Sequence, residues 1–374
     1  MHRLWIIIFL LLLFVSAIAT SYESGLRYLK YLLIAAPFIK LMSVKQYAVN
    51  RTLFSNLLLY MFLISINLVV AFIGNDFSMR MFMEILLILI PISAAIGFSE
   101  MDEKSNMKLL KYLFYIYATA FFIVFWQEFI NLGSLFKNLP RAILYSQFKT
   151  ESWMGFVFAI FSLFFFLTKQ RIHLIVALVL MFFAFKRVTW AASFASISAF
   201  FFLFQLLKFR FRPMQFKLLF AGVLVVFISL FFGFISGEFT TFIQTQTGIS
   251  INHFTQGRFF LYNRALHYFS ENYNLWFGSY LGATYDFLEP RYPNVDFLHS
   301  DLLKLILEIG IILFIIWFIS FININMTNKY TFALLIFVFV LFFTDNTLIY
   351  FDLMFLFYLF INYFSRSDAQ QNIE

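Results

Sequence analysis

Residues 302–322 read LLKLILEIGIILFIIWFISFI, an apolar run that holds only two charged side chains, Lys304 and Glu308. A helix needs about 20 predominantly apolar residues to cross the hydrocarbon core of a bilayer, and this run has that length. We therefore expect a membrane-spanning helix here. Because Lys304 and Glu308 are four positions apart, they share one face of that helix, and we expect them to neutralise each other.

Further apolar runs lie on both sides of this one. They are residues 4–19, 26–42, 53–73, 81–98, 109–125, 153–167, 174–185, 191–207, 218–235, 332–343 and 348–364. The sequence thus predicts an all-α, polytopic membrane protein with about twelve transmembrane helices. Runs 174–185 and 332–343 are shorter than the roughly 17 residues of a perpendicular span, so flanking residues must contribute or a helix must break there. The first run could imitate a signal peptide, but because many spans follow, we interpret it as a retained helix.

The composition of the whole chain agrees with a membrane protein. Of the 374 residues, 62% are hydrophobic and 12% are charged, whereas a soluble domain carries about 25% charged residues. This excludes a large soluble domain, and no basic soluble segment indicates a nucleic-acid partner. The chain has no cysteine, which excludes disulfides, thiolate metal sites and cysteine nucleophiles.

Basic residues set the expected orientation, because cytoplasmic loops retain Lys and Arg. The short basic loop 208–217 is the strongest cytoplasmic marker, and the orientation that it favours puts both termini in the cytoplasm. Residues 237–298 then form one large outer loop, inserted between membrane helices of a single membrane domain, 1–374. A loop this long in a compact chain is usually functional, and we expect it to fold over the outer face of the membrane that the helices span.

Four short stretches carry motifs: FKRVTW (185–190), GRFFLYNRAL (257–266), WFGSYLG (276–282) and HSDLLKLILEIG (299–310). Together they resemble the O-antigen polymerase and ligase family of bacterial membrane glycosyltransferases. In that family a Gly-Arg pair opens a helix in the outer loop, and a His followed by Asn or Ser starts a membrane helix with a Gly some ten residues on. The resemblance covers about residues 180–315. The chain departs from the pattern at Leu313, where the family has a second glycine, and in the looser spacing of Gly278 and Gly282.

The resemblance implies a GT-C-like fold and a metal-independent enzyme without a cofactor in the bacterial inner membrane. Its donor would be an undecaprenyl-diphosphate-linked oligosaccharide on the periplasmic face, and its partners would be membrane lipids, a chain-length regulator and a flippase. We favour a polymerase because the second glycine of the ligases is missing, although a ligase that transfers the glycan to lipid A-core stays open. A twelve-helix secondary transporter also stays open, because the span count alone fits many carriers.

His299, Arg258 and Arg187 are the catalytic candidates. When a lipid diphosphate leaves, negative charge grows on it, and the two arginines would stabilise that charge. His299 directly precedes a predicted helix with Ser300 as N-cap, whose positive end favours a neutral imidazole that can take the proton of the attacking hydroxyl. Inversion at the anomeric carbon is expected.

Lys186, Arg264 and Arg291 are the candidates for substrate binding. Arg187 and its neighbour Lys186 follow an apolar run, where a cation persists only with a partner, and an anionic ligand would satisfy it. Snorkelling to lipid headgroups is the alternative. If residues 258–272 are helical, Arg258 and Arg264 point about 120° apart, so we do not expect both to face one ligand atom.

The remaining ionisable residues are interpreted as structural. Glu84 lies in an apolar run, and Asp345 and Asp352 flank the last outer turn, where a carboxylate could bind a sugar or pair with an arginine. We favour structural pairing for each of them. No Asp-x-Asp pair stands in an outer loop, so we expect arginines to do what a divalent metal does in other transferases. His253 and His267 lack a third matched ligand, so no zinc site is predicted.

Overall fold

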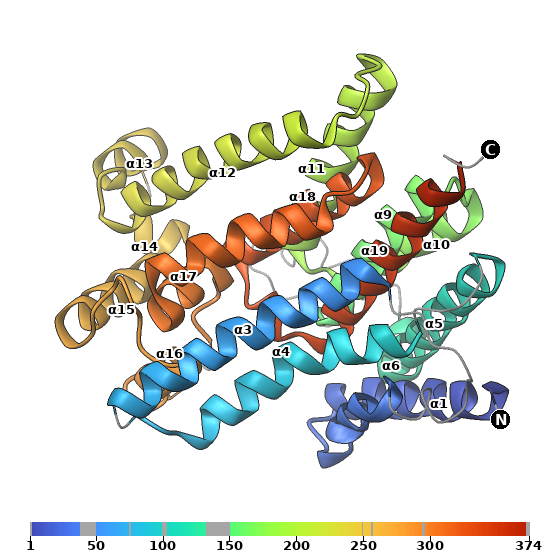
Figure 1. Ribbon diagram of the computed structural model, residues 1–374, viewed down its shortest axis with the longest axis horizontal. Coiled ribbons are helices and arrows are strands. Elements are labelled where there is room, and N and C mark those ends of the chain that lie inside the picture. The colour runs from blue at the N-terminus through green and yellow to red at the C-terminus, as the bar shows by residue number, and fades with distance from the viewer. Residues whose placement is uncertain are drawn as a thin grey trace.

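The computed structural model describes residues 2–37, 50–74, 76–98, 103–131, 150–248, 250–255, 257–293, 295 and 297–371. The elements, in chain order, are α1 (His2–Ser21), the 3₁₀ helix η1 (Gly25–Ala35), α3 (Arg51–Gly74), α4 (Met79–Gly97), α5 (Glu103–Val124), α6 (Trp126–Ile130), α9 (Met154–Leu167), α10 (Arg171–Ala184), α11 (Arg187–Phe200), the π-helix η2 (Phe201–Leu206), α12 (Pro213–Ile235), α13 (Thr240–Thr247), α14 (Ile251–Phe254), α15 (Arg258–Asn272), α16 (Ala283–Leu288), α17 (Asp301–Asn325), α18 (Lys329–Thr344), the 3₁₀ helix η3 (Thr347–Ile349) and α19 (Phe351–Gln371) (Figure 1).

The described residues form an all-helical protein with membrane character, as the sequence predicts. Six of their helices are long and apolar enough to cross a membrane: Arg51–Gly74, Met79–Gly97, Lys104–Val124, Arg187–Leu206, Pro213–Ile235 and Asp301–Asn325. The shorter apolar helices are Ile6–Ser21, Met154–Leu167, Arg171–Ala184 and Lys329–Thr344. The number of spans, about twelve by the length criterion, stays a prediction.

Besides run 191–207, which ends in the π-helix η2, and run 348–364, which begins in the 3₁₀ helix η3, two predicted spans differ from continuous α-helices. The described part of run 26–42 is the 3₁₀ helix η1, which ends at Ala35, and residues 38–42 lie outside the described residues. This segment is not apolar on every side, because Lys30 forms an ion pair with Asp352 at 2.9 Å. The second difference is in α17, where Gly310 (φ +80°, ψ 162°) interrupts the helix.

The centre of the molecule is formed by α9 and α19, which are buried on nearly all sides. A helix that is apolar all round is expected to be enclosed by other helices, and α9 packs against α10 and α11 while α19 packs against α4 and α9. Phenylalanines make these contacts, as in the stack of Phe164 on Phe360 with ring centroids 4.3 Å apart. α12, by contrast, is largely exposed.

The long segment 237–298 folds into the four short helices α13 to α16. Its apolar side chains form a small second core with the end of α12 and the start of α17, which includes Tyr262, Phe269 and Phe287. In Figure 1 this segment lies at one end of the molecule and the two chain termini lie at the other. The segment therefore covers the ends of the helices that it connects.

Candidate functional site

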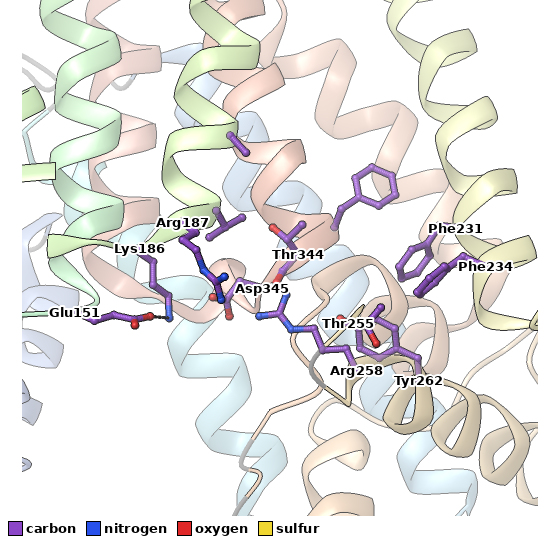
Figure 2. Close-up of a pocket in the computed structure, with 13 residues that line it drawn as sticks. Glu151, Lys186, Arg187, Phe231, Phe234, Thr255, Arg258, Tyr262, Thr344 and Asp345 are labelled. Carbon is purple, nitrogen blue, oxygen red and sulfur yellow. Dashed lines mark hydrogen bonds and ion pairs between the residues drawn. The ribbon is translucent and has the colours of Figure 1, made fainter. Parts of the chain in front are cut away.

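A cavity of about 600 Å³ lies where the start of α11, the end of α12, the start of α15 and the end of α18 meet (Figure 2). Its charged lining residues are Glu151, Lys186, Arg187, Arg258 and Asp345. Its other lining residues are Val188, Ala191, Phe231, Phe234, Thr255, Tyr262, Phe343 and Thr344. Three of the six predicted site residues thus meet in one cavity, although they come from two motifs far apart in the sequence.

A tight turn between α10 and α11 brings Lys186 and Arg187 to the cavity. Phe185 takes a left-handed conformation (φ +39°) that ends α10, and Lys186 is the residue before α11. The Lys186 ammonium lies 3.8 Å from the Glu151 carboxylate, and both side chains are partly exposed. Among the described residues, Arg187 has no hydrogen-bond or ion-pair partner, and its side chain reaches into the cavity. Arg187 is therefore a cation that is still available to a ligand.

Arg258 reaches the same cavity from the long segment. It is the first residue of α15 and follows Gly257, whose φ of +83° suits glycine at the point where the helix begins. Its guanidinium donates one hydrogen bond, from Nη1 to the carbonyl oxygen of Thr344, at 3.1 Å. Because a guanidinium has five N–H donors, most of the Arg258 donors remain for a ligand.

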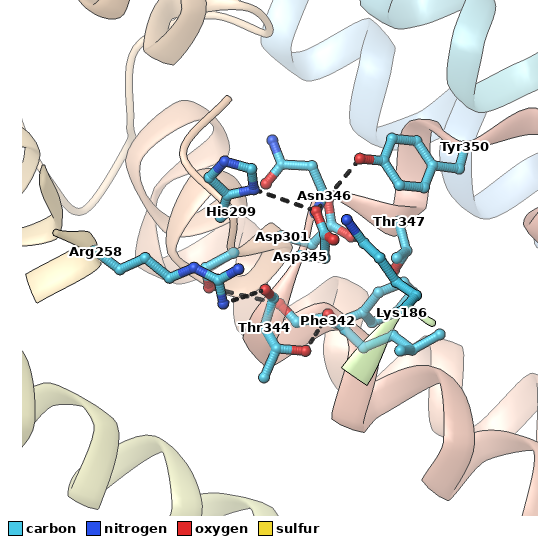
Figure 3. A network of polar contacts seen from close by, with 12 residues as sticks. Lys186, Arg258, His299, Asp301, Phe342, Thr344, Asp345, Asn346, Thr347 and Tyr350 are labelled. Carbon is cyan, nitrogen blue, oxygen red and sulfur yellow. Dashed lines mark hydrogen bonds and ion pairs between the residues drawn. The ribbon is translucent and has the colours of Figure 1, made fainter. Parts of the chain in front are cut away.

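His299 lies beside the cavity and contacts it through Asp345 (Figure 3). The Nδ1 atom of His299 is 3.4 Å from Oδ1 of Asp345, and the His299 side chain is 37% exposed while that of Asp345 is 2% exposed. The backbone of His299 has φ +56°, and its carbonyl accepts a hydrogen bond from the Tyr262 hydroxyl at 2.6 Å. A carboxylate that accepts from Nδ1–H fixes the tautomer in which Nε2 can take a proton.

Asp345 is held as a charged acceptor. Burial raises the pKa of its carboxyl, but the hydrogen bond with His299, the positive charge of Lys186 and the amide of Asn346 outweigh burial, so the pKa lies below its usual value of 3.8. The Asn346 amide donates to Oδ1 at 2.9 Å and the Tyr350 hydroxyl donates to it at 3.3 Å. The carboxylate therefore keeps its charge at neutral pH.

An apolar groove shares the lining residue Phe343 with the cavity. Figure 2 shows Phe231 and Phe234 on the far side of Arg258 from Lys186. Phe343 lines the cavity and also a second hollow of about 270 Å³, which lies between η2, α12 and α18. All lining residues of this groove are apolar: Leu203, Leu219, Phe220, Val223, Phe332, Ile336, Phe339, Val340 and Phe343.

The structure does not bring Arg264 and Arg291 to the cavity. Arg264 is exposed, with its guanidinium 5.3 Å from the centre of the Phe260 ring. Arg291 lies over Tyr268 at 4.5 Å and donates from Nη1 to the carbonyl of Phe287 at 3.0 Å. The expected divergence of Arg258 and Arg264 on a helix over 258–272 is confirmed, and a role of Arg264 and Arg291 in substrate binding stays a prediction without a contact to support it.

The contact between His299 and Asp345 was not predicted from the sequence. The predicted N-cap of α17, Ser300, is confirmed: its hydroxyl accepts a hydrogen bond from the Leu303 amide at 3.3 Å. A signal for the missed pair was present: His299 precedes one apolar run, and Asp345 follows the next. When consecutive spans are antiparallel, the start of the first and the end of the second lie at the same membrane face.

No group of three His, Asp or Glu side chains among the described residues is arranged to hold a metal ion. Comparison of the chain with protein-family models, with characterised proteins and with solved structures gives no match.

Proposed function

We propose that this chain is a membrane glycosyltransferase of the O-antigen polymerase type, which joins undecaprenyl-diphosphate-linked repeat units on the periplasmic face of the bacterial inner membrane. One observation carries the proposal: Lys186, Arg187 and Arg258 meet in a single cavity beside His299. These cations outnumber the two carboxylates that line the cavity. The surplus positive charge calls for an anionic ligand.

The surroundings of the cations favour an anion that carries a lipid tail. A cation between apolar helices persists only with a partner, and Arg187 has none among the described residues. Arginine matches phosphate oxygens with two parallel hydrogen bonds, so Arg187 and Arg258 suit a diphosphate. The apolar groove that begins at Phe343 offers room for an isoprenoid chain on the same molecule.

The proposed reaction is an inverting transfer. A hydroxyl of the acceptor sugar forms a bond to the anomeric carbon of the donor glycan, and the bond from that carbon to the lipid diphosphate breaks. Arg187 and Arg258 stabilise the negative charge that grows on the departing diphosphate. Nε2 of His299 takes the proton of the attacking hydroxyl, and Asp345 holds the ring and stabilises the imidazolium that results.

The acceptor distinguishes polymerase from ligase. A polymerase uses a second lipid-linked repeat unit, and a ligase uses lipid A-core, while both need the same donor site. We favour the polymerase because Leu313 replaces the second glycine of the ligases. A flippase would supply the donor, and a chain-length regulator would act on the product.

The test is the polysaccharide profile of cells that lack the gene. Cells are complemented with the wild type or with Arg187→Ala, Arg258→Ala or His299→Ala, with membrane expression measured for each. Arg210→Ala is the control, because Arg210 is an exposed arginine of the basic loop 208–217 and lies outside the cavity. We expect core plus one repeat unit in the null strain and in the three site variants, and full-length polymer with Arg210→Ala.

Other profiles lead to other conclusions. Core alone, with long polymer accumulating on undecaprenyl diphosphate, would identify a ligase. An unchanged profile in the null strain, or full complementation by all three site variants, would refute the transferase and favour the transporter.

A further inference from the structure

We infer that residues 274–281, here called the wedge, dock into the break of α17 and thereby hold His299 at the cavity. Gly310 divides α17 into a first half, 301–309, and a second half, 311–325. His299 and its neighbour Ser300 directly precede the first half. The position of His299 therefore depends on what fixes this half-helix. The inference rests on the proposed function only for its effect on catalysis.

The amides that lose their helical partners at the break bind the wedge instead. In a continuous α-helix, the amides of residues 311 and 312 would donate to the carbonyls of residues 307 and 308. Here the Ile311 amide donates to the Leu275 carbonyl at 3.0 Å, and the Ile312 amide donates to the Trp276 carbonyl at 3.3 Å. The wedge thus supplies two acceptors to amides inside an apolar helix, where an unpaired buried amide is costly.

The two carbonyls that lose their partners bind the wedge as well. The Ser279 amide donates to the Leu307 carbonyl at 3.2 Å and to the Glu308 carbonyl at 3.1 Å. A side chain of α3 joins both parts: Asn67 donates from Nδ2 to the Glu308 carbonyl at 3.1 Å and accepts from the Leu281 amide at 2.9 Å. The amides of residues 311 and 312 and the carbonyls of residues 307 and 308 are therefore all paired.

Two glycines make this contact possible. A Cβ on Gly278 would lie 2.3 Å from the Gly310 amide nitrogen, and a Cβ on Gly310 would lie 2.4 Å from the Phe277 carbonyl carbon. These neighbours are backbone atoms, which cannot rotate aside. Both glycines also have positive φ, +79° and +80°.

A second contact fixes the same half-helix from the element after the wedge. Thr284 of α16 donates to Oε1 of Glu308 from its amide at 3.2 Å and from its hydroxyl at 2.5 Å. Gly278, Gly310 and Asn67 do not line the cavity. They are positioning residues: they act on the reaction through the half-helix that carries His299.

The first test measures glycan transfer by purified Gly310→Ala, Gly278→Ala and Asn67→Leu with a lipid-diphosphate-linked repeat unit. We expect kcat to fall about 100-fold while KM for the donor stays near that of the wild type, because displacing a catalytic group by about 1 Å has an effect of that size and the arginines still bind the donor. Asn67→Leu introduces no backbone clash, so it keeps the test informative if the glycine variants fold poorly.

Two other glycines are matched controls. Gly222 lies in α12, and a Cβ there meets nothing within 4 Å. Gly248 has φ +68° but also no neighbour within 4 Å, so it separates backbone strain from close approach. Gly222→Ala and Gly248→Ala should both keep the wild-type kcat. A wild-type kcat in Gly310→Ala, Gly278→Ala and Asn67→Leu alike would overturn the positioning role.

A second test examines the docking without using activity. Because the chain has no cysteine, the pair Leu275→Cys and Ile311→Cys can be joined by a short bis-methanethiosulfonate reagent in membranes. We expect a cross-link, since the backbones of these residues are joined by a hydrogen bond. No cross-link, with each single cysteine reactive toward a maleimide, would overturn the docking. If the pair cross-links but the unmodified wild-type protein transfers no glycan, the proposed function is overturned while the docking of the wedge stands.

Discussion

Two clusters of ionisable residues in this protein differ in their balance of cations and carboxylates. In the first, between α4 and α17, Glu84 binds Arg80 and Lys304, each at 2.6 Å, and Lys304 lies 3.9 Å from Glu308. Two cations thus balance two carboxylates, and Lys304 is only 6% exposed. In the second, the cavity, three cations face two carboxylates.

The difference shows how buried charge indicates function in a membrane protein. Removing a charge from water is costly unless it is paired, and the Glu84 cluster meets that requirement internally. The expected pairing of Lys304 with Glu308 is confirmed as part of this cluster, with Glu84 as the closer partner of Lys304. The cavity does not meet the requirement, since Arg187 has no partner among the described residues. A cluster with unbalanced charge beside an open volume is the better candidate for a ligand site.

Breaking the balanced cluster should have the largest effect on stability. Lys304→Met leaves two buried carboxylates with one cation, and we expect it to lower the free energy of unfolding by about 3–5 kcal/mol. Unfolding in mixed dodecyl maltoside and SDS micelles measures the change.

The double variant Lys304→Met/Glu308→Gln is the control for that prediction. It leaves Arg80 and Glu84 as a neutral pair, so most of the lost stability should return. If the double variant is as unstable as the single one, packing rather than charge holds the cluster together.

Removing an unbalanced cation should affect activity instead. We expect Arg187→Ala to lower kcat about 10²- to 10³-fold, because it removes a group that stabilises the leaving diphosphate. Its unfolding free energy should change by less than about 0.5 kcal/mol, as for a side chain without partners. Arg187→Lys keeps the charge but loses the planar fork, so it should recover part of the rate. A strongly unstable but active Arg187→Ala would erase the distinction between the two clusters.

The sequence predicted the helices well because a membrane span has to be a long apolar run. The run 81–98 became α4 at Met79–Gly97, and 302–322 became α17 at Asp301–Asn325. The sequence did not predict that Gly310 breaks α17, since the break depends on a partner, the wedge, that comes from a distant motif. It likewise selected Arg187 and Arg258 but could not place Asp345 against His299. That contact depends on how α17 and α18 pack.

A third, intermediate effect concerns the single carboxylate that holds His299. Asp345→Asn should lower the free energy of unfolding by about 1.5–3 kcal/mol, the range for hydrogen bonds to a charged group. Because the pKa of Asp345 is lowered in the folded protein, this contribution is complete above the usual value of 3.8 and is lost as the pH falls through the folded pKa.

Measuring the unfolding free energy of the wild type and of Asp345→Asn across a pH series tests the direction of this pH dependence. The difference between the two proteins should shrink as the pH falls below 3.8, the usual pKa of the carboxyl, and through the folded pKa. A difference that grows toward acid would mean that Asp345 is not held as a carboxylate in the folded protein.

The smallest effects are expected at the arginines outside the cavity, which the sequence alone could not separate from Arg258. Arg291 stacks on Tyr268 and Phe287, with its guanidinium 4.5 Å and 4.9 Å from the two ring centres. Arg291→Ala should therefore lower the free energy of unfolding by about 0.5–1 kcal/mol, the range for an exposed cation–π contact. It should leave kcat and KM for the donor unchanged, because Arg291 does not line the cavity. A loss of transfer at normal stability would show that the glycan extends over α15 and α16, and that the functional surface is larger than the cavity where the charges are unbalanced.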